Sequence, residues 1–285
     1  MRKVPLTVLF VDSMLARIYL AMLLKHGLLP EKVIVLKTDP PTFGEQLFKL
    51  GADGNDIALS ERWREKHPVP DFLAKLLLAE FGLTLADLCN CLSCVPTATV
   101  SELSIKNLKD PKLLSALRKD EDQTFLFTGG GILDDKLLSL ANSKFVHIHP
   151  GFLPDVRGAD GLLWSYLLRG KPGYTVFFMN EGIDTGDILY RKEFDLVDWQ
   201  GQLNNLPEYS IYVGLLQFYD PCLRIITLIE FIDSCFAETT QSMSVQTLMS
   251  VPVRQQTVPE GRTYFFMTKL FRERVIHKFI QEKPL

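Results

Sequence analysis

The chain has 285 residues, with 31 Lys plus Arg, 34 Asp plus Glu and a formal net charge of −3. Hydrophobic residues make up 47% of it and charged residues 23%, which suits a globular chain and excludes disordered, collagen-like and small disulfide-rich proteins. The balance of charge gives no general attraction to nucleic acid or to an anionic membrane.

The first 200 residues alternate short apolar runs with helical patterns. Residues 6–12 indicate a buried strand rather than a signal peptide, because Asp12 interrupts the apolar run and no cleavage pattern follows. A helix over 14–26 follows, with Gly27 as its stop. Further strands are expected at 33–36, 97–100, 124–128, 145–148, 175–179 and 187–194, and further helices at 72–81, 110–119, 134–141 and 161–169. This alternation predicts an α/β fold whose mainly parallel sheet carries helices on both faces.

Beyond about residue 200 the pattern becomes mostly helical. We therefore divide the chain into an α/β domain at 1–200 and a mostly helical C-terminal extension at 201–285. The apolar segment 211–231 contains Asp220 and Arg224, whereas a membrane span needs about 20 residues nearly free of charge. We expect a packed helix there, either inside the molecule or at the face of a homodimer, and no membrane.

Three of the five cysteines, Cys89, Cys91 and Cys94, lie close together in the sequence. A zinc site needs a fourth ligand, and no second Cys or His pair stands at the spacing of a zinc ribbon or finger. We expect buried free thiols in a reducing compartment, hence a cytoplasmic protein without a bound metal.

Two expected strand ends carry residues suited to a ligand site. Gly129-Gly130-Gly131 matches neither a dinucleotide fingerprint nor a P-loop, so it indicates either a tight turn or a backbone that a flat ligand approaches closely. The second strand end is His147-Ile-His149-Pro-Gly151. Side chains alternate along a strand, so both imidazoles point the same way, where they can donate hydrogen bonds and move protons near neutral pH.

A third feature is the polar segment Asn180–Asp187, which contains Asp184 between two glycines. It lacks the spacing of a calcium loop and indicates a polar hairpin turn or a carboxylate placed to orient a base.

Together these residues resemble the formyltransferase family that uses 10-formyltetrahydrofolate. The family pattern is Asn-x-His-Pro, then Leu-Pro-x-x-x-Gly, Gly-x-Thr-Val and Asp-x-Gly. The chain reads His147-Ile-His149-Pro150, Leu153-Pro154-Asp-Val-Arg157-Gly158, Gly173-Tyr-Thr175-Val176 and Asp184-Thr-Gly186. The clear match covers 110–194.

The resemblance implies a Rossmann-like sheet, formyl transfer and a 10-formyltetrahydrofolate co-substrate. The family's catalytic Asn, His and Asp fall on His147, His149 and Asp184. The implied folate residues are Gly131, Ile132, Leu133, Leu138, Met179, Asn180 and Gly182, and the implied acceptor residues are Gly151, Arg157, Asp160 and Trp164.

The departure from the family is His147, which stands where the family has an asparagine that donates to the formyl oxygen. An imidazole N–H also donates, so either the chemistry survives with a changed geometry or the site binds folate without transfer. A 10-formyltetrahydrofolate hydrolase and a non-catalytic folate-fold protein therefore stay open beside the transferase.

The acceptor follows by elimination. A methionyl-tRNA formyltransferase-like enzyme usually has a basic C-terminal domain, but residues 201–285 hold eight Lys plus Arg and eight Asp plus Glu, so no nucleic acid is expected. Glycinamide ribonucleotide formyltransferases of the family have a glycine-rich phosphate-binding loop after the first strand. Residues 11–15 of this chain contain no glycine, so such a loop is not expected here. The remaining expectation is a nucleotide-linked amino sugar or a similar small amine.

Overall fold

The computed structural model describes residues 1–38, 47–51, 56–119, 121–129, 133–199, 201–237, 244–257 and 259–281. A seven-stranded sheet organises the fold, in the order β10-β9-β7-β6-β1-β2-β5. Its strands are β1 (Arg2–Phe10), β2 (Leu28–Thr38), β5 (Val100–Ile105), β6 (Gln123–Phe127), β7 (Ser143–His149), β9 (Gly173–Phe178) and β10 (Ile188–Glu193). Among the pairs, only those with β9 are antiparallel within this sheet. The mainly parallel α/β sheet is thereby confirmed.

Helices cover both faces of this sheet. The helical elements of the amino-terminal part are α1 (Met14–Lys25), α2 (Glu61–Lys66), α3 (Asp71–Ala79), α4 (Leu85–Asn90), the 3-10 turn η2 (Thr97–Thr99), α5 (Pro111–Leu117), α6 (Asp135–Leu138) and α7 (Gly161–Arg169). Helix α1 begins where expected, because the Ser13 side chain accepts from the Ala16 amide and satisfies a free N–H of the first turn.

Alternation along the strands divides the apolar side chains between two cores. On β7, Val146 and Ile148 join the larger core, which also holds the buried face of α1. Phe145 points to the opposite side of the strand and joins the smaller core, which is formed with Leu113 of α5 and Leu137 of α6. The period of two thus places every second residue of β7, including both histidines, on the α5–α6 side.

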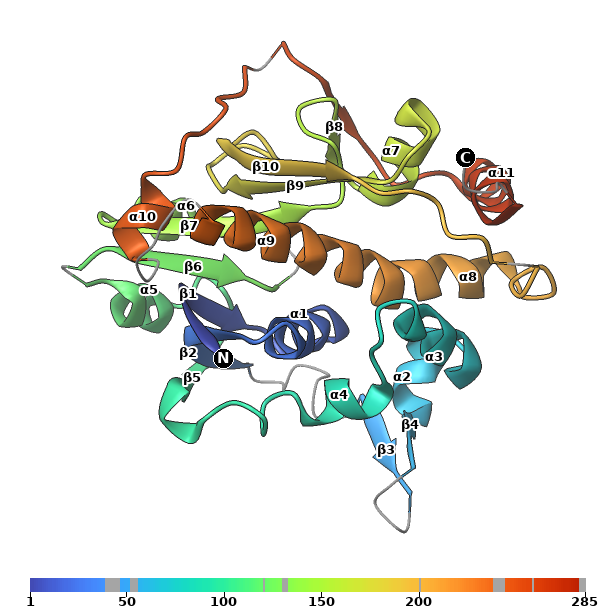
Figure 1. The fold of residues 1–285 in the computed structure, drawn as a ribbon, viewed down its shortest axis with the longest axis horizontal. Helices are drawn as coiled ribbons and strands as arrows, with labels where there is room; N and C mark the ends of the chain where they lie inside the picture. The colour runs from blue at the N-terminus through green and yellow to red at the C-terminus, as the bar shows by residue number, and fades with distance from the viewer. Residues whose placement is uncertain are drawn as a thin grey trace.

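The C-terminal part is dominated by one long helical run, made of α8 (Glu208–Gly214), the π-turn η3 (Leu215–Tyr219) and α9 (Asp220–Ala237) (Figure 1). It packs against α1 and against β9 and β10, and Ile225, Leu228 and Ile232 of α9 are buried within the chain. The expectation of a helix packed inside the molecule is therefore confirmed for this segment. Among the described residues, no helix has the length and apolarity to cross a membrane.

Several short strands and helices were not predicted from the sequence pattern. A hairpin of β3 (Phe48–Leu50) and β4 (Ile57–Leu59) lies between β2 and α2, and the short helix α10 (Val245–Met249) follows α9. The last helix, α11 (Lys269–Gln281), follows the short strand β11 (Arg262–Tyr264). Strand β11 pairs in parallel with β8 (Val156–Gly158), which joins two segments about a hundred residues apart.

Candidate active site

A cavity of about 670 Å³ opens at the carboxyl ends of β1, β6 and β7. The strand order reverses here, because β1 leads to β2 on one side and β6 leads to β7 on the other. Ligands of open α/β sheets bind at such a switch point. We call this the strand-end cavity, and its described lining is Leu15, Gly129, Leu133, Leu138, His147, Gly158, Ala159, Phe177, Met179, Asn180, Glu181, Gly182, Ile183, Asp184, Arg224, Thr263, Tyr264, Phe265 and Phe266.

The two histidines of β7 occupy different depths. His147 lines the cavity between the rings of Phe127 and Phe177, with centroid distances of 6.4 and 5.9 Å. Its Nδ1 is buried and has no hydrogen-bond partner among the residues that the structure describes. His149, two residues on, is only 2% exposed and is not part of the described lining. His147 is therefore the imidazole that a ligand meets.

Asp184 reaches the cavity from the hairpin between β9 and β10, as expected of a polar turn. Its backbone adopts φ 53°, a left-handed conformation that Asp and Asn tolerate better than most residues. Its Oδ2 accepts from the Gly158 amide at 2.8 Å and lies 3.4 Å from Nδ1 of His149. The turn thus brings a carboxylate between β8 and the buried histidine, and the three expected catalytic residues lie together.

His149 lies between two groups that only accept hydrogen bonds. Its Nε2 is 2.9 Å from the carbonyl oxygen of Val156, while Nδ1 faces the Asp184 carboxylate. A neutral imidazole carries one N–H, so one of these contacts lacks a proton, whereas an imidazolium satisfies both. The geometry of His149 and Asp184 can therefore accommodate one extra proton, and of these two residues Asp184 lines the cavity.

Burial and neighbouring charge set the protonation of both histidines. Burial, reinforced by the positive charge of Arg224, lowers the pKa of His147 to about 4, so this imidazole is neutral near pH 7. Burial also lowers the pKa of His149, and the Asp184 carboxylate opposes that shift. His147 is therefore a neutral donor, whereas the proton of His149 depends on Asp184.

Five of the seven folate positions expected from the resemblance line the strand-end cavity: Leu133, Leu138, Met179, Asn180 and Gly182. The other two, Gly131 and Ile132, lie outside the described residues. Asn180 also braces the turn, because its Oδ1 accepts from the Gly182 amide at 3.1 Å and from the Thr185 hydroxyl at 2.9 Å. The expected folate positions therefore gather on one wall, beside His147 and Asp184.

None of the four expected acceptor residues belongs to the described lining. Arg157 is buried and donates to Gln256, whose amide in turn donates to the carbonyl oxygens of Asp184 and Gly186. Asp160 accepts from Tyr212 and from the Met267 amide. Arg157 thus braces the turn that carries Asp184, and Asp160 holds the C-terminal segment.

The remaining two acceptor candidates also have structural contacts. The Trp164 ring packs on Tyr264 with a centroid distance of 4.6 Å, and its Nε1 donates to the Phe265 carbonyl oxygen. Gly151 lies against His149, because a Cβ at residue 151 would stand 2.3 Å from Nε2 of that imidazole. The absence of a side chain at Gly151 therefore lets His149 approach the backbone.

Two contributions to the cavity lay outside the sequence reasoning. The first is residues 263–266, which β11 holds against the catalytic segment: the Tyr264 carbonyl oxygen accepts from the Ala159 amide. The second is Arg224 of α9. A charge in the middle of the apolar segment 211–231 was the one sequence signal for Arg224.

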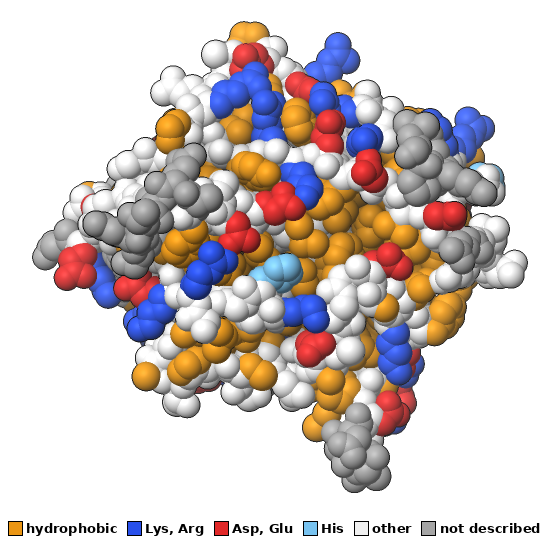
Figure 2. Space-filling model, viewed as in Figure 1, with side chains coloured by type: hydrophobic (Ala, Val, Ile, Leu, Met, Phe, Trp, Pro, Cys, Tyr) orange, Lys and Arg blue, Asp and Glu red, His pale blue; other side chains and the backbone are white. Residues whose placement is uncertain are grey.

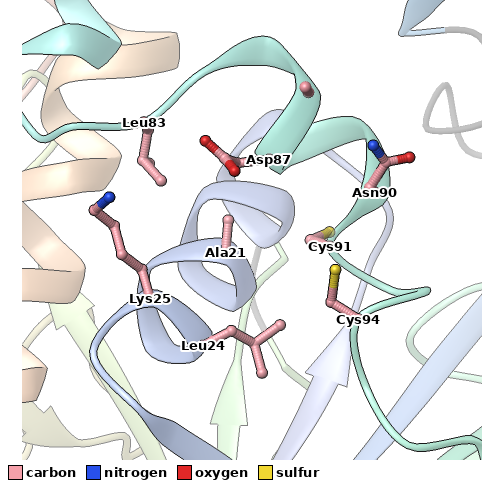
Figure 3. Close-up of a pocket in the computed structure, with 9 residues that line it drawn as sticks. Ala21, Leu24, Lys25, Leu83, Asp87, Asn90, Cys91 and Cys94 are labelled. Atoms are coloured by element: carbon pink, nitrogen blue, oxygen red, sulfur yellow. The ribbon is translucent and has the colours of Figure 1, made fainter. Parts of the chain in front are cut away.

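A second cavity, of about 330 Å³, lies between α1 and α4, away from the switch point (Figure 3). Cys91 and Cys94 line it with Lys25 and Asp87. Burial raises the pKa of the Cys91 thiol to about 12, and all five cysteines are free. Cys94 is exposed, so the expectation of buried thiols is wrong for this residue. Within the described ranges, no cluster of three or more His, Cys, Asp or Glu could hold a metal ion.

Comparison with known proteins bears on the same segment. Residues 91–205 match the model of the family described as formyl transferase. The methionyl-tRNA formyltransferase of Syntrophus aciditrophicus is 37% identical over 89 residues, which are 30% of this chain and 28% of the relative. That of Ehrlichia ruminantium is 31% identical over 120 residues, which are 39% of each chain. The chain thus matches roughly a third of the length of these curated relatives.

Among solved structures, a sugar N-formyltransferase from Shewanella sp. FDAARGOS_354 aligns with a TM-score of 0.42 and 15% identity, over 96% of this chain and 86% of that one. A 4-N formyltransferase from Francisella tularensis aligns with a TM-score of 0.46 and 13% identity, over 98% and 87%. The matched segment 91–205 contains β5 to β10, and with them both histidines and Asp184. The resemblance to formyltransferases is thus confirmed for this segment of the chain.

Proposed function

We propose that this protein is an enzyme that moves a formyl group from 10-formyltetrahydrofolate to an amine of a small acceptor. The observation that carries the proposal is the strand-end cavity, where His147 and Asp184 share one space with the apolar residues Leu133, Leu138 and Met179. Family membership of residues 91–205 supports the same chemistry.

The cavity fits the formyl donor in size and in character. Its volume of about 670 Å³ lies within the range of about 300–1,000 Å³ that suits small ligands. An apolar wall suits a flat ring system, and Gly129 and Gly182 let a ligand approach the backbone. The donor supplies an activated formyl carbon, and the protein residues orient it and move protons.

In this proposal the amine nitrogen attacks the formyl carbon while His147 donates its N–H toward the formyl oxygen. Asp184 faces the cavity and takes the proton that leaves the amine, with His149 behind it as the second half of the pair. The same pair returns a proton to the leaving nitrogen of the folate. Positioned acid–base groups of this kind contribute about 10²–10⁴-fold to rate.

For the acceptor, we propose a nucleotide-linked amino sugar. Phe265 and Phe266 line the cavity with side chains that are 81% and 74% exposed, so their rings are free to stack on a planar base. Lys and Arg side chains are interspersed with Asp and Glu on the face shown in Figure 2, which agrees with the balanced charge of residues 201–285. A small acceptor needs no extended basic surface.

Methionyl-tRNA is the second candidate, because several curated relatives of the matched segment are methionyl-tRNA formyltransferases. Such an acceptor would bind with a steep dependence on salt, since each phosphate contact releases counterions. A nucleotide-linked sugar would show a much weaker dependence.

The test is a transfer assay with the purified chain, 10-formyltetrahydrofolate and a panel of acceptors: thymidine- and uridine-diphosphate amino sugars, methionyl-tRNA, and buffer alone. Tetrahydrofolate released together with a formylated sugar would support the proposal. Release with formylated methionyl-tRNA would replace the acceptor, and release in buffer alone would identify a hydrolase. No tetrahydrofolate in any arm would refute the proposed transfer.

A further inference from the structure

Arg224 is the one arginine in the described lining of the strand-end cavity. It comes from α9, outside the matched family segment, and its side chain is 16% exposed. Asp220, one turn earlier and fully buried, holds it: Nε of Arg224 is 2.7 Å and Nη2 is 2.5 Å from Oδ2 of Asp220. The Tyr174 hydroxyl donates to the other carboxylate oxygen of Asp220 at 3.0 Å. The guanidinium is therefore fixed before any ligand arrives.

The guanidinium keeps hydrogen-bonding capacity toward the cavity. Nη1 of Arg224 lies 3.4 Å from the carbonyl oxygen of Ile148, the residue between the two histidines. The ion pair and this long contact use three of the five N–H groups of an arginine. The buried Tyr19 hydroxyl also interacts with this guanidinium, and Arg224 lines the same space as His147.

Arg224 also acts on His147 electrostatically. Because a fixed positive charge disfavours a second one, Arg224 adds to burial in lowering the pKa of His147. The strand-end cavity therefore combines the neutral imidazole of His147 with the permanent positive charge of Arg224. A family site with asparagine has a neutral amide where this chain has His147.

We propose that Arg224, fixed by Asp220, is a further catalytic residue that stabilises the negative charge on the formyl oxygen during transfer. The inference rests on the proposed function. His147 contributes a directed N–H, and Arg224 contributes the charge that a neutral imidazole lacks.

The step balances as follows. The amine lone pair forms a bond to the formyl carbon, and the carbonyl π electrons move to the formyl oxygen, which becomes an oxyanion opposite Arg224. When the oxyanion collapses, the bond between the formyl carbon and N10 of the folate breaks, and N10 takes the proton released by the amine. Arg224 stays protonated throughout, so it gives charge and no proton.

The test changes Arg224 and Asp220 together, because a neutral residue at 224 alone would leave the Asp220 carboxylate buried without its cation. In Arg224→Gln/Asp220→Asn both residues keep their approximate shape and lose their charge. Loss of a donor at other oxyanion sites lowers kcat by about 10²–10³-fold, and we expect the same here. Binding of 5-formyltetrahydrofolate, a stable isomer of the donor, should change less than about threefold, since the folate wall lies elsewhere.

A matched control removes a second ion pair that involves α9, between Asp233 of that helix and Arg2 of β1, both of which are about half exposed. Arg2→Gln/Asp233→Asn should leave kcat unchanged. Arg224→Lys, which keeps the charge, should restore at least part of the activity lost in the neutral pair. A titration of the His147 imidazole by NMR adds a readout apart from activity: its pKa should rise in the neutral pair and stay low in Arg224→Lys.

The outcomes separate the inference from the proposed function. If the wild-type chain transfers no formyl group to any acceptor, the proposed function fails and the inference with it. If the wild type is active and the neutral pair, folded as judged by its thermal unfolding, keeps kcat within threefold, the inference alone is wrong. An unchanged His147 pKa in the neutral pair would likewise overturn the role of Arg224 as the cation beside His147.

Discussion

The exchange Asp184→Asn tests the role of the buried proton pair. Asparagine tolerates the left-handed backbone of residue 184, and its side-chain oxygen can still accept from the Gly158 amide. The same oxygen also faces Nδ1 of His149, so a neutral imidazole can donate to it from Nδ1, while Nε2 faces the Val156 carbonyl oxygen without a proton. The substitution thus removes the negative charge beside His149 and keeps the hydrogen bond to Gly158.

These contacts determine how much the free energy of unfolding and kcat should change. Because the hydrogen bond to Gly158 is kept, the free energy of unfolding should change by less than about 1.5 kcal/mol. The imidazole is locked in its neutral form and the cavity loses its proton acceptor. We therefore expect kcat to fall by about 10²–10⁴-fold, the usual contribution of a positioned acid–base group.

The assay measures kcat with the best acceptor, the dissociation constant of 5-formyltetrahydrofolate and the urea midpoint for wild type and variant. Asp187→Asn is the control, since it makes the same change three residues on, outside the described cavity lining. A folded Asp184→Asn variant with at least a tenth of the wild-type kcat would refute the proton-pair reasoning.

Two further predictions concern the pH dependence and the bracing of the turn. Because the pKa of His147 is lowered to about 4, the unfolded chain binds a proton between pH 6.5 and 4 that the folded chain does not. The free energy of unfolding therefore decreases as the pH is lowered through this range. His147 should contribute a loss of about 2 kcal/mol between pH 7 and pH 5 in urea unfolding, and His147→Asn should remove it; an unchanged slope would contradict the pKa shift. Gln256→Ala deletes the bonds of 3.2 and 2.6 Å to the carbonyl oxygens of Asp184 and Gly186, and it takes an acceptor from Arg157. We expect a loss of about 1–3 kcal/mol in thermal unfolding and a lower kcat, whereas the exposed Gln246→Ala should behave as wild type.

Elements with their own local signals were predictable from the sequence. Asp110 and Pro111 mark the start of α5, and in the structure Asp110 accepts from the Lys112 amide at that helix start. The expected helix 161–169 agrees with α7, which Gly170 ends with φ 78°. Residues of this kind act within one turn of the chain, so their effect is visible without the fold.

Elements that depend on distant partners were not predictable in this way. Strand β11 has three residues and exists because β8 offers a free edge about a hundred residues earlier. Gly158 and Gly261 permit that approach, since a Cβ would meet the Tyr264 carbonyl oxygen at 2.2 Å and the Pro154 carbonyl oxygen at 1.6 Å. No periodicity in either segment carries this information.

The candidate site shows the same division. His147, His149 and Asp184 were recognisable because their motifs have fixed spacing along the chain, and five folate positions followed from the same motifs. The different depths of the two histidines depend on the fold, because the Val156 carbonyl oxygen and Asp184 draw His149 inward. Arg224 entered the cavity only once α9 had packed against the sheet.

The central claim is a folate site at the strand ends, and the most direct measurement is a titration of the purified chain with 5-formyltetrahydrofolate, followed by intrinsic fluorescence. Leu133 is buried and lines the cavity, so Leu133→Asp should abolish binding by placing a charge on the apolar wall. Leu50→Asp, at an exposed leucine of β3, is the control. The account predicts saturable micromolar binding that the Leu50→Asp variant keeps and the Leu133→Asp variant loses. Absence of saturable binding to the wild type, or equal binding to a folded Leu133→Asp variant, would contradict it.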